Sequence, residues 1–70
     1  MIVKDIGKQI FKRRKKLNLE LIDLSDYSGV TVSTISNIEN GKSNPTLKTI
    51  EKLLLPLGLE LTTILKEKST

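Results

Sequence analysis

Apolar residues recur at helical spacing near the start of the chain, where Ile6, Ile10 and Leu17 lie four and seven positions apart. Because about 3.6 residues complete one helical turn, this spacing predicts a helix over residues 3–16 with one apolar face. Arg14 lies close to that face, where an unpaired guanidinium would be costly. Its charge therefore needs either a carboxylate partner or an extended side chain that reaches water.

Two short helices separated by a glycine are predicted next. The first spans residues 20–27, and its inward-facing residues are expected to be Leu21, Leu24 and either Tyr27 or Ser28. Gly29 then occupies a position where a chain leaving a helix favours a positive φ. Thr31 can cap the next helix by accepting a hydrogen bond from a backbone N–H two or three residues further on.

Residues 31–40, the second of these helices, divide their side chains between two faces. One face carries Val32, Ile35, Ile38 and Glu39. The other carries Ser33, Asn37 and Asn40, flanked by Thr34 and Ser36. Short hydrogen-bonding side chains are common at helix ends, but they also suit a helix that contacts the base edges and phosphates of a nucleic acid. Glu39 is the carboxylate on an inner face, so we predict that it pairs with Arg14.

A fourth helix is predicted to begin after Thr46, which can cap it. Gly41 closes the helix before it. The apolar stripe of the fourth helix consists of Leu47, Ile50, Leu53, Leu54 and Leu57. Pro56 lacks an N–H and would collide with the preceding helical turn, so the helix is expected to end near Leu55.

The last part of the chain alternates with a period near two. A strand with this period would place Leu59, Leu61, Thr63 and Leu65 on one side. The adjacent threonines favour a strand, although a helix with Leu61, Ile64 and Leu65 on one side remains an alternative. A single strand in a helical domain lacks a partner, so we expect it to pair with its copy in a second subunit.

The length and composition narrow the classes of function. Seventy residues allow one small domain, and a chain this short buries only about 60% of its unfolded surface, so stabilisation by homodimerisation is expected. The chain contains no Cys and no His. It therefore lacks thiolate and imidazole metal ligands and the commonest general base, and we predict no enzymatic activity, no metal site and no cofactor.

The positive charge is concentrated in the first predicted helix. The net charge is +4, and residues 4–16 contain seven basic residues and one acidic residue. Residues 17–41 contain no Lys or Arg, so any attraction between the 31–40 helix and phosphates must come from neighbouring elements. A basic amphipathic helix also suits an anionic membrane, but Phe11 is its only aromatic anchor and the chain lacks Trp.

No feature of the sequence favours a membrane or an exported protein. No apolar run approaches the roughly 20 residues that span a bilayer. The first residues lack the charged-then-apolar order of a secretory signal. We therefore expect a cytoplasmic protein that makes no contact with a membrane.

Several short motifs follow one another in a fixed order. They are Ile6-Gly7-Lys8, Ser28-Gly29-Val30, the run from Thr34 to Gly41, and Asn44-Pro45-Thr46-Leu47. Together they resemble the helix-turn-helix domain of the phage-repressor family, also called lambda-repressor-like or xenobiotic-response-element (XRE), over about residues 5–58. The resemblance implies an all-α, five-helix domain whose third helix, at about residues 31–40, enters the major groove of double-stranded DNA.

The resemblance also implies roles for individual residues. The base-contacting residues would be Val32, Ser33, Thr34 and Asn37. The phosphate-contacting residues would be Thr31, Ser36, Asn40, Lys42 and Ser43. Arg14 and Glu39 would form the family's internal ion pair, in agreement with the argument from helix faces. One departure is Leu21, which stands where many members have a Gln that contacts phosphate, so this anchor is missing.

The tail differs from most relatives, which have a capped fifth helix there. Residues 57–66 resemble HipB-type antitoxins, in which the final segment pairs as a strand across a dimer. The expected division is therefore a DNA-binding domain at residues 1–58 and a dimerisation segment at residues 59–70, with contacts from Leu59, Leu61, Thr63 and Leu65. The expected function is a homodimeric, sequence-specific repressor. The alternative is an antitoxin that neutralises a kinase-like toxin and represses its own operon.

Overall fold

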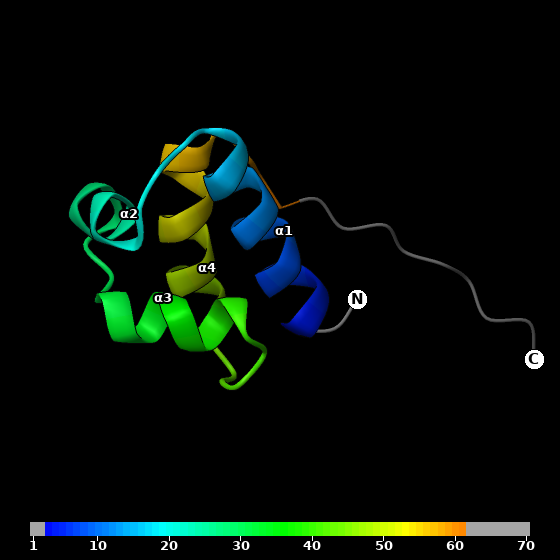
Figure 1. Ribbon diagram of the computed structural model, residues 1–70. Coiled ribbons are helices and arrows are strands. Elements are labelled where there is room, and N and C mark those ends of the chain that lie inside the picture. Colours follow the sequence, from blue (N-terminus) through cyan, green and yellow to red (C-terminus); the bar gives the residue numbers. More distant parts are fainter. Residues whose placement is uncertain (1–2, 62–70) are drawn as a thin grey trace, which may run out of the picture.

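Four α-helices and one short 3-10 helix make up the computed structural model, which describes residues 3–61 (Figure 1). The elements are α1 Val3–Lys16, α2 Leu21–Ser28, α3 Val32–Glu39, α4 Leu47–Leu54 and the 3-10 helix η1 Leu55–Leu57. α3 lies across one end of α1 and α4, and α2 lies on the other side of α4 from α1 (Figure 1). The all-α prediction is confirmed over this range, which contains η1 but no fifth α-helix.

Side-chain caps determine where α3 and α4 begin. The hydroxyl of Thr31 accepts a hydrogen bond from the Thr34 N–H at 3.2 Å, and Thr46 accepts one from the Thr49 N–H at 3.1 Å. Both predicted caps are confirmed, and each satisfies a backbone donor that has no partner within the helix. α2 begins one residue later than predicted because Glu20 is its cap residue, and the Glu20 N–H donates to Asp23 Oδ2 at 2.8 Å.

Glycines with positive φ follow α2 and α3, as predicted. Gly29 has a φ of 77°, and its N–H donates to the carbonyl of Ser25 at 2.9 Å. Gly41 has a φ of 70°. Residues with a Cβ rarely adopt this conformation, so the two glycines allow the chain to leave each helix and start the next within a few residues. The helix, turn and helix formed by residues 21–39 thus follow from local sequence signals.

The core lies where the four helices meet. Its fully buried side chains are Ile10, Leu24, Ile35, Ile38, Leu53 and Leu57. Two predicted core positions are wrong, because Leu17 is 41% exposed and Leu47 is 67% exposed. Both lie at helix ends, where the apolar stripe continues past the elements that cover it. Tyr27 is also exposed, whereas Ser28 is half-buried. Of the two residues predicted as alternatives for the inner face of α2, Ser28 is therefore the one that lies there.

α4 ends at Leu54, one residue before the predicted end, and continues into η1. Pro56 lies in the first turn of η1, where a backbone N–H has no partner within that helix and its absence costs little. η1 buries Leu57, whose carbonyl accepts a hydrogen bond from Arg13 Nε at 2.9 Å. Of the predicted strand, residues 59–61 form no strand, and Thr63 and Leu65 lie outside the described residues.

Within residues 3–61, no helix combines the length and the apolar character that crossing a membrane requires.

Candidate nucleic-acid interface

Arg14 and Glu39 form a buried ion pair that joins α1 to α3. Arg14 Nε donates to Glu39 Oε2 at 2.8 Å and Arg14 Nη2 donates to Glu39 Oε1 at 2.9 Å. A third bond runs from Arg14 Nη1 to the carbonyl of Leu19 at 2.8 Å. The hydrogen bond to Glu39 raises the pKa of Arg14 although burial opposes this. The predicted pair is confirmed, and its two parallel bonds restrict rotation of α3 about its own axis.

Gly7 allows α1 and α3 to cross closely. A Cβ at this position would overlap the carbonyl oxygen of Ile38, and it would also approach the backbone of Glu39. Gly7 belongs to the Ile6-Gly7-Lys8 motif, but this packing role was not predicted from the sequence. The position of Gly7 inside a predicted helix could have indicated this role. Glycine there costs about 1 kcal/mol of helix stability relative to alanine, so it often marks a place where another element packs closely.

The outer face of α3 carries the predicted base-contacting side chains. Ser33, Thr34 and Asn37 are exposed, and Val32 is half-buried at the first position of the helix. On the opposite face, Ile35 and Ile38 are fully buried. The predicted division of this helix into an apolar and a polar face is therefore confirmed. α3 presents a row of short, uncharged hydrogen-bonding groups and no Lys or Arg.

The predicted phosphate-contacting residues differ in whether their polar groups are exposed and not already hydrogen-bonded within the protein. Thr31 Oγ1 is occupied by the cap of α3. Asn40 Nδ2 donates to the carbonyl oxygen of Ser36 at 2.9 Å and to the Ser36 hydroxyl at 3.4 Å, so this amide group is engaged at the end of α3. Lys42 is exposed immediately after the turn at Gly41. Ser43 Oγ is buried and has no hydrogen-bond partner in the described part of the chain, so it does not face solvent.

The basic residues of α1 whose side chains the structure describes, those from Lys8 onward, divide into structural and solvent-facing groups. Arg13 and Arg14 make internal hydrogen bonds, to Leu57 and to Glu39 respectively. The solvent-facing group consists of Lys8, Lys12, Lys15 and Lys16. The positive field of the domain therefore extends from α1, the helix that packs against α3.

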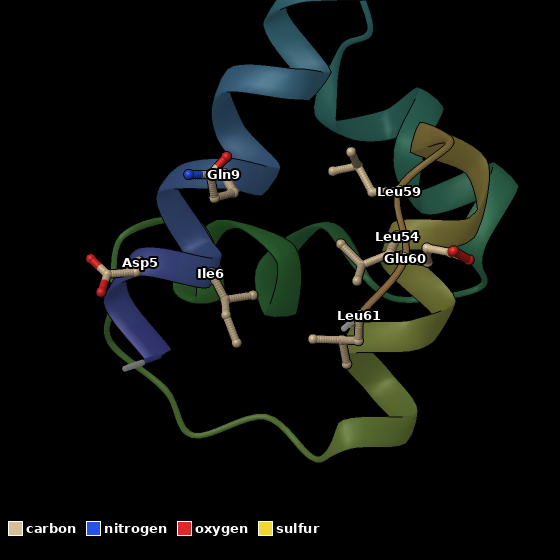
Figure 2. A pocket seen from close by; sticks show the side chains of 7 residues that line it. All are labelled: Asp5, Ile6, Gln9, Leu54, Leu59, Glu60 and Leu61. Carbon is tan, nitrogen blue, oxygen red and sulfur yellow. The ribbon is translucent and has the colours of Figure 1, made fainter. Parts of the chain in front are cut away.

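An apolar groove lies between α1 and the chain that follows η1. It has a volume of about 290 Å³ and is lined by Asp5, Ile6, Gln9, Leu54, Leu59, Glu60 and Leu61. Figure 2 shows Ile6 and Leu61 on opposite walls with their side chains directed toward the space between them. Two of the predicted dimerisation residues, Leu59 and Leu61, therefore line one groove, where they are half-buried.

The acidic residues of the described part of the chain are dispersed. No three of them gather in an arrangement that could hold a metal ion.

Comparison with known proteins gives one family model and several relatives. A model described as helix-turn-helix matches residues 10–64. An uncharacterized HTH-type transcriptional regulator of Haemophilus influenzae is 39% identical over 57 residues, which cover 81% of this chain and 58% of that protein. The HTH-type transcriptional regulator SinR of Bacillus licheniformis is 36% identical over 64 residues, covering 90% of this chain and 58% of SinR.

A longer relative matches over a similar stretch. The HTH-type transcriptional regulator PuuR of Escherichia coli is 36% identical over 61 residues, which cover 87% of this chain and 33% of PuuR. The chain thus spans between one third and somewhat over half of the length of these relatives. No solved structure gives a significant match.

Proposed function

Because the chain belongs to the helix-turn-helix family of the phage-repressor type, we propose that it is a sequence-specific DNA-binding transcriptional regulator. The observation that carries this proposal is the exposed row of Ser33, Thr34 and Asn37 on α3. The buried pair of Arg14 and Glu39 holds the helix that bears the row. A rigid row of short polar side chains on the exposed face of a helix can enter a major groove and reach base edges there.

The chemistry of the row suggests which bases it reads. The amide of Asn37 can donate to N7 and accept from the N6 amino group of an adenine, and the methyl groups of Val32 can contact the methyl group of a thymine. The hydroxyls of Ser33 and Thr34 can donate to or accept from either base pair. Guanine is usually read by Arg or Lys, and α3 has neither. These contacts favour A·T pairs in the half-site.

Backbone contacts would orient α3 in the groove. Lys42 is exposed and can reach a phosphate. Asn40, Ser36 and Thr31 already make hydrogen bonds within α3 and its caps, so they are candidates for weaker contacts. Ser43 could contribute its hydroxyl only after its side chain rotates outward, because the oxygen is buried.

We propose further that the protein acts as a homodimeric repressor. A second copy is the occupant that best fits the apolar groove of Figure 2, because Leu59 and Leu61, which belong to the segment predicted to pair between subunits, line it. A toxin protein is the other candidate for this surface. A regulator of this kind acts on DNA in the cytoplasm and needs no cofactor or catalytic activity.

The experiment that tests DNA recognition is selection of bound duplexes from a random library. We expect enrichment of an inverted repeat rich in A·T pairs, with half-sites about 34 Å apart, one helical turn of DNA. Gel-shift titration of the enriched duplex against a scrambled duplex then measures discrimination. Equal affinity for both at every salt concentration would refute sequence-specific binding.

A further inference from the structure

We propose that the cleft between α1 and the C-terminal end of α3 binds a phosphate group of the DNA backbone, with Lys8 and Lys12 as its cations. The cleft has a volume of about 380 Å³ and is lined by Lys8, Phe11, Lys12, Glu39 and Asn40. This inference rests on the proposed function and adds two contact residues on α1, Lys8 and Lys12, which lie outside the helix-turn-helix segment and were not among the site residues predicted from the sequence.

The charge balance of the cleft is positive although a carboxylate lines it. Both oxygens of Glu39 accept hydrogen bonds from Arg14, so the guanidinium compensates this negative charge. The ammonium groups of Lys8 and Lys12 therefore remain unbalanced at the cleft. The Lys15 ammonium lies 5.8 Å from the centre of the Phe11 ring, which places a third cation close to the same wall. An anion is the complementary ligand.

The position of the cleft identifies that anion as a backbone phosphate. Asn40 lines the cleft and also ends the outer row of α3, since it is three residues after Asn37 on the same face. A helix that lies in a major groove has a sugar-phosphate strand along each side. The cleft therefore opens where a strand beside α3 would pass, and α3 itself has no cation to hold that strand.

The close crossing of α1 and α3 keeps the lysines at this place. Gly7 precedes Lys8 directly and contacts the backbone of Ile38, one residue before Glu39. Lys8 and Lys12 lie four residues apart, so both project from the same side of α1. Lys16 continues along the helix but lines a different cleft, with Gln9, Lys12, Arg13 and Leu59, next to the chain that follows η1.

The test compares Lys8→Ala, Lys12→Ala and the double variant with Lys16→Ala as the matched control. All remove exposed lysines from α1, and the melting curve of each variant establishes that it folds. Fluorescence anisotropy measures binding to the library-selected duplex and to a random duplex between 50 and 300 mM salt, a range of about sixfold. We expect the double variant to lower the salt slope, the fall of log K with log salt, by about one unit on both duplexes, and Lys16→Ala to lower it by much less.

A neutral backbone analogue locates the phosphate. Single methylphosphonates are placed in turn through the selected duplex, each removing one negative charge. At one methylphosphonate position per half-site, wild type should bind the duplex more weakly than it binds the unmodified duplex. The double variant should bind both equally, because it already lacks the contact. The inference is overturned if the double variant keeps the wild-type salt slope, or if Lys16→Ala lowers the slope by the same amount. In either case the proposed function still stands as long as wild type prefers the selected duplex. If wild type binds no duplex, both proposals fail.

Discussion

The guanidinium of Arg14 and the carboxylate of Glu39 are joined by two parallel hydrogen bonds, and each side chain is only 5% exposed. The two residues are 25 positions apart and belong to α1 and α3. Their pairing connects the basic helix to the helix proposed to read DNA. Since a charge buried without its partner is unfavourable, the orientation of α3 depends on both members being present.

Removing one member of this pair should destabilise the domain strongly. Glu39→Ala leaves the Arg14 guanidinium buried without a carboxylate, and we expect a loss of about 3–5 kcal/mol in the free energy of unfolding. This loss is comparable with the whole stability of many small domains. Urea unfolding followed by circular dichroism measures it. As a control, Arg14→Met combined with Glu39→Leu should recover most of the stability because it leaves no unpaired charge. A Glu39→Ala variant with the wild-type urea midpoint would contradict this role.

Gly7→Ala should destabilise the protein although alanine is the better helix former. The added Cβ would overlap the Ile38 carbonyl, so α1 and α3 must move apart, at a cost of about 1–3 kcal/mol. Gly29→Ala is the contrasting variant: nothing lies within 4 Å of its added Cβ, and its cost arises from the φ of 77° alone. Thermal melting compares the two variants. Gly7→Ala should also bind DNA more weakly than its smaller fraction of folded protein explains. A melting temperature above that of wild type would contradict the tight crossing of α1 and α3.

Much of this fold follows from local signals in the sequence. The helix bounds agree with the structure to within about a residue because the caps at Thr31 and Thr46 and the glycines at positions 29 and 41 act over only a few residues. The pairing of Arg14 with Glu39 was also predictable, because two charges on inner faces each require the other.

Features that depend on how helices cross were not predictable in the same way. Leu47 continues the apolar stripe of α4 but is exposed. The spacing of apolar residues identifies one face of a helix, but it does not show which part of that face another element covers. The cleft beside Lys8 and Lys12 exists only through the crossing at Gly7. The family resemblance implied a phosphate contact for Ser43, whereas its hydroxyl is buried because of how the loop after α3 folds.

Asn37→Ala tests base reading by α3. If the amide contacts an adenine edge, its removal should weaken binding to the selected duplex by about 1–3 kcal/mol and relax the preference at one base pair per half-site. Affinity for random DNA should stay the same. Gln9→Ala is a suitable control because it removes an exposed amide from α1, beside the groove of Figure 2. Repeating the library selection with each variant reads out the preference, and an unchanged consensus for Asn37→Ala would remove this residue from the reading set.

Lys42→Ala should weaken binding to every sequence by the same factor. The side chain is exposed directly after Gly41, and a phosphate contact carries no base information. We expect the salt slope to fall by about one unit on both selected and random duplexes. Anisotropy titrations at several salt concentrations measure the slope, with Lys52→Ala on α4 as a control of equal charge change. A loss confined to the selected duplex would instead indicate that Lys42 reads a base.

Truncation after Leu61 tests whether the tail joins two copies of the chain. This end point keeps Leu57 in the core and leaves Leu59 and Leu61 packed against it, so the helical domain should still fold. If residues 62–70 complete the dimer, analytical ultracentrifugation should find the truncated chain as a monomer and the full chain as a dimer at the same concentration. Binding to a single half-site should persist, while the added affinity for an inverted repeat should disappear because the second domain is no longer linked. Ile22→Lys, which changes an exposed residue of α2 away from Leu59 and Leu61, should leave the dimer intact. A truncated chain that remains dimeric would assign the subunit contact to another surface.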